Sequence, residues 1–224
     1  MRKKAKMKKS EVIQPEGNYY DKYHSHNPIV KWMMSNFRTS MMELLAEVNK
    51  PVYICEAGCG EGEISIFLHE LYAEARIDAF DISEKVVREA KNRITGINFY
   101  VGDIYSMTVI NPDEMVKYVL KNNVYNLVVC SEVLEHLENP ESALKRIKEL
   151  LAEDGVALLS VPNEPIWRIL NMLRGKYWKE LGNTPGHIQH WSKKSFYAML
   201  KKNDWNIIDT KSPFPWTMVL VNNR

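Results

Sequence analysis

The sequence predicts an α/β fold, a doubly wound and mostly parallel sheet with helices on both faces. Apolar runs typical of strands alternate with segments whose apolar residues recur at helical spacing, from Val52 to Val161. This alternation requires crossover connections, which join parallel strands. The run from Tyr125 to Ser131 is apolar almost throughout, as is typical of a central strand covered on both faces.

A glycine-rich turn follows the first predicted strand, Val52 to Cys55. Its sequence is EAGCGEG at positions 56–62, and the next apolar residues, at positions 64, 67, 68 and 71, share one helix face. Glycine accepts positive φ and lets the backbone approach a ligand, while a helix start attracts negative charge. Strand, turn and helix together predict a site for a nucleotide-like ligand.

Elements before and after this turn are predicted from caps and spacing. Residues 1–17 predict a basic, solvated tail, and residues 18–50 a helical cap that starts at Asn27-Pro28 and forms one helix or two. Asn111-Pro112 predicts a further helix, which should run to about Leu120. Residues 163–191 predict an insertion with a short helix and an aromatic loop, and the final strands are expected at 205–209 and 216–221.

Composition limits the class of protein only coarsely. The chain has 224 residues, a net charge of +2 and an odd number of cysteines, three. One domain over residues 18–224 is therefore expected, with no preference for nucleic acid, no disulfide and no metal. Because no run of 18 apolar residues occurs, we expect no membrane span, and a cytoplasmic location is the default. The oligomeric state is left open.

Polar residues gather at the carboxyl ends of the predicted strands, where open α/β sheets bind their ligands. An acid after the second strand, Asp81, can accept hydrogen bonds from the hydroxyls of a ribose, which would also fit a nicotinamide cofactor. Glu56, however, stands two residues before Gly58 and would repel a pyrophosphate, and the third glycine of the dinucleotide pattern is displaced. A cofactor with a cationic amino or sulfonium group is favoured.

These motifs resemble those of class I S-adenosylmethionine-dependent methyltransferases. The glycine turn resembles their first motif, and Cys130-Ser131-Glu132-Val133-Leu134-Glu135-His136-Leu137 resembles the segment after their fourth strand. The similarity covers about residues 50–162 and is closest to the ubiquinone- and menaquinone-biosynthesis-like branch of small-molecule enzymes. It implies a Rossmann-like sheet of seven strands with the last one antiparallel, and S-adenosylmethionine as cofactor. The residues expected to bind it are Glu56, Ala57, Gly58, Cys59, Gly60, Asp81, Ile82, Asp103, Ile104, Ser131 and Glu132.

Several of these residues have a structural alternative. Glu56 could cap the glycine turn itself, Asp81 could be a helix N-cap, and Asp103 could form a turn after its glycine. Cys59 is expected to pack in the core, with its backbone facing the ligand. His136 is the candidate catalytic base, because histidine titrates near neutral pH, but it could equally orient its loop or contact the cofactor.

The acceptor side is predicted from two aromatic segments. His187, His190 and Trp191 are expected to form a wall of the acceptor pocket, and no third ligand for a metal is evident beside the two histidines. Tyr19, Tyr23 and His24 are candidates for a lid over the site, or for an aromatic plug. The predicted activity is methyl transfer to a small-molecule or lipid-like acceptor, on oxygen. The rivals are a protein or RNA methyltransferase, suggested by the basic tail, and a catalytically silent cofactor-binding subunit.

Overall fold

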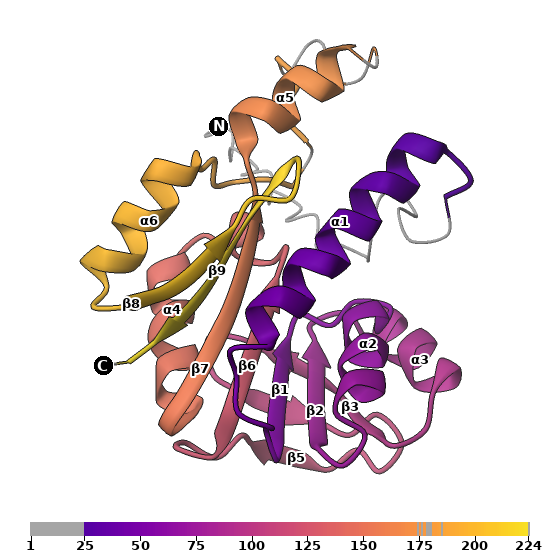
Figure 1. The fold of residues 1–224 in the computed structure, drawn as a ribbon. Coiled ribbons are helices and arrows are strands. Elements are labelled where there is room, and N and C mark those ends of the chain that lie inside the picture. The colour runs from indigo at the N-terminus through magenta and orange to yellow at the C-terminus, as the bar shows by residue number, and fades with distance from the viewer. Residues whose placement is uncertain (1–24, 174, 176, 178–180, 185, 224) are drawn as a thin grey trace, which may run out of the picture.

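A single sheet runs through the computed structural model, which describes residues 25–173, 175, 177, 181–184 and 186–223. The sheet has nine strands in the order β5-β4-β3-β2-β1-β6-β7-β9-β8 (Figure 1). The strands are β1 (Tyr53–Ala57), β2 (Arg76–Asp81), β3 (Ile97–Asp103), β4 (Thr108–Ile110), β5 (Lys117–Val119), β6 (Tyr125–Ser131), β7 (Leu151–Pro162), β8 (Asn206–Lys211) and β9 (Trp216–Asn222).

Strand directions confirm the predicted doubly wound topology. β1 lies between β2 and β6 and is parallel to both, and the parallel pairing continues outward to β3 and β7. β9 is antiparallel to both of its neighbours, β7 and β8, so the last strand is antiparallel as the family resemblance implied. All parallel strands therefore end at one edge of the sheet, where ligands of such folds bind.

The helix predicted from Asn111 to about Leu120 is wrong, and the sheet has nine strands rather than seven. This segment is the β4–β5 hairpin, in which Thr108 pairs with Val119 and Ile110 with Lys117. The Asn111 side chain accepts the backbone N–H of Asp113 at 3.0 Å, and the backbone of Asn111 receives a bond from Met115. Asn111 thus closes a turn here instead of capping a helix. In both structures the asparagine side chain accepts a hydrogen bond from a backbone N–H a few residues later in the chain.

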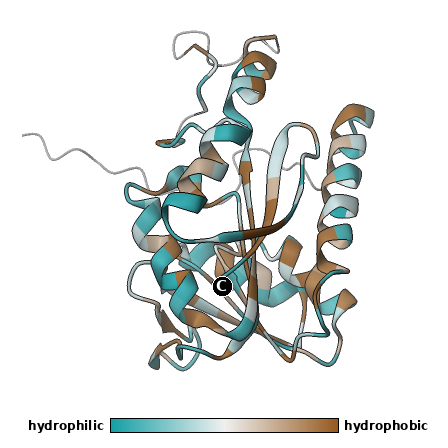
Figure 2. Ribbon diagram, turned by 60° about the vertical axis from the view of Figure 1, so that its left-hand side comes forward, coloured by the Kyte–Doolittle hydropathy of each residue, from teal (hydrophilic) through white to brown (hydrophobic). Residues whose placement is uncertain are grey.

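Helices cover both faces of the sheet, as predicted. One face carries α1 (Pro28–Leu45), α2 (Glu63–Leu71) and α3 (Glu84–Arg93), and the other carries α4 (Pro140–Leu150) and α6 (Lys193–Lys202). These helices combine hydrophobic and hydrophilic stretches, as expected for helices with one buried face (Figure 2). α1 is one continuous helix, capped by the side chain of Asn27, which settles the choice between one helix and two.

Two hydrophobic cores hold these layers together. Phe37 of α1, Leu68 of α2 and Val87 of α3 are fully buried on the first face. Leu144 of α4 and Phe196 of α6 are fully buried on the second. None of the helices built from the described residues is long and apolar enough to cross a membrane.

One helix does not cover a sheet face. α5 (Glu164–Leu173) stands beyond the end of β7, at the edge where the parallel strands end (Figure 1). Residues 181–184 are tied to it, since Asn171 donates to the carbonyl of Gly182 at 2.9 Å and Trp167 donates to the hydroxyl of Thr184 at 3.0 Å. The predicted insertion therefore lies at the ligand-binding edge. The predicted domain bounds stay a prediction.

Candidate functional site

The glycine turn between β1 and α2 is held in a left-handed conformation. Gly58, Gly60 and Gly62 have φ values of +81°, +51° and +82°, which residues with a Cβ rarely adopt. The N–H groups of Gly58 and Cys59 both donate to the carbonyl of Phe80 in β2, at 2.7 and 3.0 Å. The turn is thereby fixed to the end of the neighbouring strand.

Gly58 also marks a close approach to the segment that follows β6. A Cβ at this position would lie 2.2 Å from a methyl group of Val133, closer than side chains can stand. Only glycine lets the two segments meet, so the turn after β1 and the turn after β6 form one surface. The prediction that the strand ends meet at one site agrees with this contact.

Asp81 joins the turn to the end of β2. Its carboxylate accepts the N–H of Gly60 at 3.1 Å and that of Ser83 at 2.9 Å, and burial raises its pKa above the ordinary value. Ser83 is the N-cap residue before α3, but its side chain makes no capping hydrogen bond. Because Asp81 accepts the N–H of Ser83, it takes over part of the capping role left open for it. A carboxylate has about four acceptor sites, so acceptor capacity remains for ribose hydroxyls.

Glu56 is buried beneath the turn, with 2% of its surface exposed. The hydroxyl of Ser65 in α2 donates to its carboxylate. Burial raises the pKa of Glu56 to about 8, against the opposing effect of the Ser65 hydrogen bond. The side chain is therefore mostly protonated at neutral pH unless a cation lies beside it. Ala57 and Cys59 are buried with it, and Cys59 packs in the core as expected.

The ends of β3 and β6 supply the remaining predicted residues. Asp103 accepts the N–H of Tyr105 at 3.0 Å, which is the turn-forming role left open for it, and Ile104 is buried. The hydroxyl of Ser131 lies 2.6 Å from that of Ser160 in β7. Glu132 follows with a φ of 60°, a conformation that costs energy for a residue with a side chain. Ile82, half exposed, follows Asp81 at the same edge.

The space around Gly60 tests whether a cofactor can approach the glycine turn. A Cβ built on Gly60 meets no atom within 4 Å, so the backbone there faces open space beside the carboxylate of Asp81. The turn thus presents its backbone, beside the carboxylate of Asp81, to an open region at the carboxyl edge of β1 and β2. Adenosine and methionine moieties could be held there by Asp81, Asp103 and the turn.

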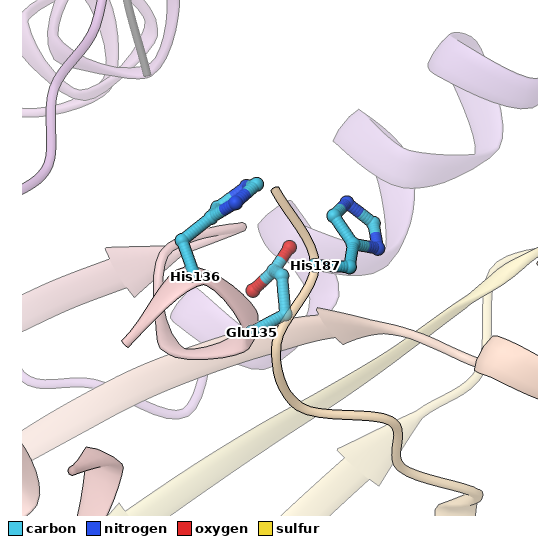
Figure 3. A group of neighbouring side chains, drawn as sticks. All are labelled: Glu135, His136 and His187. Carbon is cyan, nitrogen blue, oxygen red and sulfur yellow. The ribbon is translucent and has the colours of Figure 1, made fainter. Parts of the chain in front are cut away.

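Histidines from two distant segments meet next to this edge. The 3-10 helix η1 (Leu134–His136) follows β6, and Nδ1 of His136 lies 3.0 Å from the carbonyl of Gly186. The rings of His136 and His187 stand nearly perpendicular, with centroids 4.9 Å apart. Glu135, 1% exposed, places its carboxylate between the two rings (Figure 3).

The residues predicted to line the acceptor pocket lie in different surroundings. His187 bonds through Nδ1 to the buried Glu164 of α5, and Nδ1 of His190 lies 3.8 Å from the other carboxylate oxygen of Glu164. Trp191 is buried, and its ring packs on that of Phe196 at 5.6 Å, so it belongs to the core around α6. The candidates for a lid lie outside the described residues: Tyr19, Tyr23 and His24.

A cleft of about 570 Å³ opens between α5 and the start of α6. Its lining is partly apolar, with Ile169, Met172 and Leu181, and it includes Glu164 and His190. Glu164 therefore lies at the boundary between this cleft and the histidine cluster.

Sequence reasoning missed Glu135 and Glu164 as site residues. Both are charged residue types that are almost never fully buried unless they are paired. In the sequence each lies just past the end of a predicted central strand, Glu135 after β6 and Glu164 after β7. The rule that strand ends carry the site could have selected them, but it does not by itself predict burial.

The comparison with family models decides the class of this protein. A model described as "Methyltransferase domain" matches residues 30–210, which is most of the chain. The chain belongs to the methyltransferase domain family. The prediction of a class I, S-adenosylmethionine-dependent methyltransferase is thus confirmed for the family, its fold and its cofactor. The assignment to the ubiquinone- and menaquinone-like branch stays a prediction.

Curated relatives of this chain are distant, and the chain spans only 61%, 49% and 31% of the length of the three described here. It is 23% identical over 180 residues to a malonyl-[acyl-carrier protein] O-methyltransferase of Bacillus anthracis, covering 79% of this chain and 61% of the relative. It is 28% identical over 139 residues to a trans-aconitate 2-methyltransferase of Methylobacterium nodulans, covering 60% and 49%. An N-methyltransferase for (S)-coclaurine from Thalictrum flavum is 26% identical over 125 residues, covering 52% of this chain and 31% of its own.

Solved structures share the fold. A methyltransferase solved in complex with the Trm112 activator of Haloferax volcanii superposes with a TM-score of 0.64 at 13% identity, covering 86% of this chain and 96% of that one. A SAM-dependent methyltransferase from Aquifex aeolicus superposes with a TM-score of 0.63 at 11% identity, covering 87% and 93%. At such identities the likeness concerns the fold alone.

Proposed function

We propose that this methyltransferase moves a methyl group from S-adenosylmethionine to an oxygen of a small-molecule or lipid-like acceptor. The observation that carries the proposal is at the edge of the sheet where the parallel strands end. Gly60, bonded to the carboxylate of Asp81, faces open space there, and α5 with its partly apolar cleft stands at the same edge. The curated relatives support the acceptor class, because those named above act on small or carrier-bound molecules according to their names.

Bound S-adenosylmethionine supplies an activated methyl group on a sulfonium, and the protein has to align an acceptor with it. The acceptor oxygen attacks the methyl carbon, the carbon–sulfur bond breaks, and its electron pair neutralises the sulfonium. Alignment alone can supply about 7–11 kcal/mol of the barrier. The chain's own contribution is therefore mainly positional, through the rigid turn and through the segment around Val133 that packs against it.

The donor side is assigned to three carboxyl groups. Asp81 would bind the ribose hydroxyls, and Asp103 with Ile104 would border the adenine. Glu56 would face the cationic amino end of the cofactor, and its buried carboxyl would lose its proton when that cation arrives, since an opposite charge favours the ionised form. His136 as a catalytic base stays a prediction at this stage.

The acceptor side is assigned to the cleft under α5. Its apolar residues Ile169 and Met172 suit an acceptor with apolar surface, and Arg168 and His190 supply polar groups at the rim. A lining that combines apolar side chains with a few polar groups is usual for a small-molecule site. The basic residues of the tail, which suggested RNA as an alternative acceptor, lie outside the described residues.

The test is a labelling experiment with fractionation. Purified protein is incubated with methyl-labelled S-adenosylmethionine and an extract, and the label is followed into small-molecule, lipid, protein and RNA fractions, with the product identified by mass. We expect label in the small-molecule or lipid fraction, and loss of it with Asp81→Asn. Label confined to protein or RNA would refute the acceptor class. Cofactor binding by calorimetry with label in no fraction would favour the silent subunit.

A further inference from the structure

We infer that Glu135, His136 and His187 bind a divalent transition-metal ion that holds the acceptor oxygen, a role for the ion that rests on the proposed function. One potential ligand atom from each of the three side chains lies within 4.8 Å of the other two (Figure 3). Carboxylate and imidazole ligands stand about 2.0–2.2 Å from zinc. A small rotation of these side chains would bring all three to one ion.

The hydrogen bonds of both histidines favour metal binding. The carbonyl of Gly186 can only accept, so Nδ1 of His136, 3.0 Å away, must carry the proton. Nδ1 of His187 likewise donates to the carboxylate of Glu164. In a neutral imidazole the other nitrogen, Nε2, then carries the lone pair. Each ring is held in the tautomer that a metal ligand requires.

Glu164 is not one of the three proposed ligands, but it bonds to His187 and orients its ring. A ligating histidine in metalloproteins usually donates its second N–H to a carboxylate or a carbonyl, which orients the ring. The N–H of His187 bonds to the carboxylate of Glu164, and the N–H of His136 bonds to the carbonyl of Gly186. The same arrangement at both histidines is difficult to explain by packing alone.

Backbone bonds bring the two halves of the site together before any ion binds. The N–H groups of Ile188 and Gln189 both donate to the carbonyl of Glu135, at 2.8 and 3.0 Å. The side chain of Gln189 also donates to the carbonyl of Leu137 at 3.1 Å. The loop that carries His187 is therefore bonded to the backbone on both sides of His136, at Glu135 and at Leu137. The proposed ligands lie close together before an ion binds.

Charge supports a cation at this place. The side chains of Glu135 and Glu164 are 1% and 2% exposed; His187 bonds to Glu164, and one of its ring nitrogens lies within 4.8 Å of a carboxylate oxygen of Glu135. Buried carboxylates are costly unless they are paired or coordinate metals. A divalent ion at the cluster would lie beside both carboxyl groups. Two imidazoles and one carboxylate suit Mn²⁺, Fe²⁺, Co²⁺ or Zn²⁺ better than Mg²⁺ or Ca²⁺, which prefer all-oxygen sites.

Three protein ligands leave coordination positions for an acceptor oxygen. A bound ion would lower the pKa of an acceptor hydroxyl, so that its proton could pass to water and the oxygen could attack the methyl carbon. Because η1 follows Val133, which contacts the glycine turn, the ion would stand beside the cofactor edge. His136 would then be a ligand and not the base.

Metal binding is tested without cofactor or acceptor. Protein freed of metal with a chelator is titrated with Co²⁺ by visible absorption and with Zn²⁺ by calorimetry. We expect one ion per chain, affinity lowered at least 100-fold by His187→Ala or Glu135→Gln, and lowered about tenfold by Glu164→Gln, which only positions His187. His190→Ala, which also changes a histidine next to Glu164, is the control and should keep the wild-type affinity.

Two further measurements make the outcome decisive. Binding of S-adenosylhomocysteine, measured by calorimetry, should be equal in wild type and His187→Ala, which shows that the variant is folded. If the wild type binds no more Co²⁺ or Zn²⁺ than His187→Ala does, the metal site is refuted. If the ion binds but no fraction is methylated, only the proposed function fails. Methyl transfer that is unchanged by the chelator refutes the ion's role in holding the acceptor.

Discussion

Replacing Glu56 with glutamine should make the protein's stability less dependent on pH. Burial raises the pKa of this carboxyl from an ordinary value of 4.5 to about 8 in the folded state. Between these two pH values the folded protein keeps a proton that the unfolded chain has lost. The stability contributed by that proton is complete below about pH 4.5 and is lost as the pH rises to about 8.

The magnitude follows from the two pKa values. At about 1.4 kcal/mol per pH unit, the interval from 4.5 to about 8 corresponds to at most about 5 kcal/mol. Glutamine keeps the shape and can still bond to the Ser65 hydroxyl, but it has no charge to bury. Glu56→Gln should therefore gain stability over the wild type at pH 8.5 by about 2–4 kcal/mol more than at pH 5.

Urea denaturation of wild type and variant at pH 5 and pH 8.5 measures this difference. Glu153→Gln, which changes an exposed glutamate in β7, is the matched control and should show no such change. If the stability difference between wild type and Glu56→Gln is the same at both pH values, the buried carboxyl does not titrate as argued. In calorimetry at pH 7, Glu56 should also release a proton when the cofactor binds, a release that Glu56→Gln should lack.

Three further predictions concern the turn, the ribose site and the core. Gly60→Ala should weaken binding of S-adenosylhomocysteine at least tenfold in calorimetry, whereas Gly175→Ala, which also has positive φ and open space around its Cβ, should leave it unchanged. Asp81→Asn should weaken the same binding about tenfold, because an amide is a poorer acceptor for two hydroxyls; unchanged affinity would remove Asp81 from the ribose site. Phe37→Ala should lower the free energy of unfolding by about 3–5 kcal/mol in urea titrations, since its ring is fully buried against Trp216.

The geometry of the turn after β1 could be predicted because it depends on local chemistry, whereas the role of its residues in binding a cofactor stays a prediction. Glycines at three spaced positions require a tight turn, and Asp81 ends a strand whose apolar residues are evident. The rule that parallel strands end at one edge then brings such residues together. The structure adds what no pattern contains, namely that Glu56 is buried under the turn and bonded to Ser65.

The acceptor half depends on contacts between distant segments. His136 and Gly186 are 50 positions apart, and nothing in either stretch specifies the other. The hairpin at residues 108–119 was mispredicted for a related reason, since Asn111 makes the same kind of side-chain to backbone bond in a turn as in a helix cap. The first strand of this hairpin pairs with β3, and such tertiary pairing cannot be recognised from the local sequence.

Donor and acceptor are thus assigned to different pairs of strands at one edge. β1 and β2 carry the glycine turn and Asp81, while the segments after β6 and β7 carry Glu135, His136 and Glu164. The contact between Gly58 and Val133 is the point at which the two halves meet, and a Cβ there would have to push them apart. The proposed donor and acceptor residues come from different strands and meet at Gly58 and Val133. Substitutions in the histidine cluster should therefore change the rate of methyl transfer to the acceptor without changing the affinity for the cofactor. Gly58→Ala, in contrast, should impair both, since it separates the donor surface from the acceptor surface.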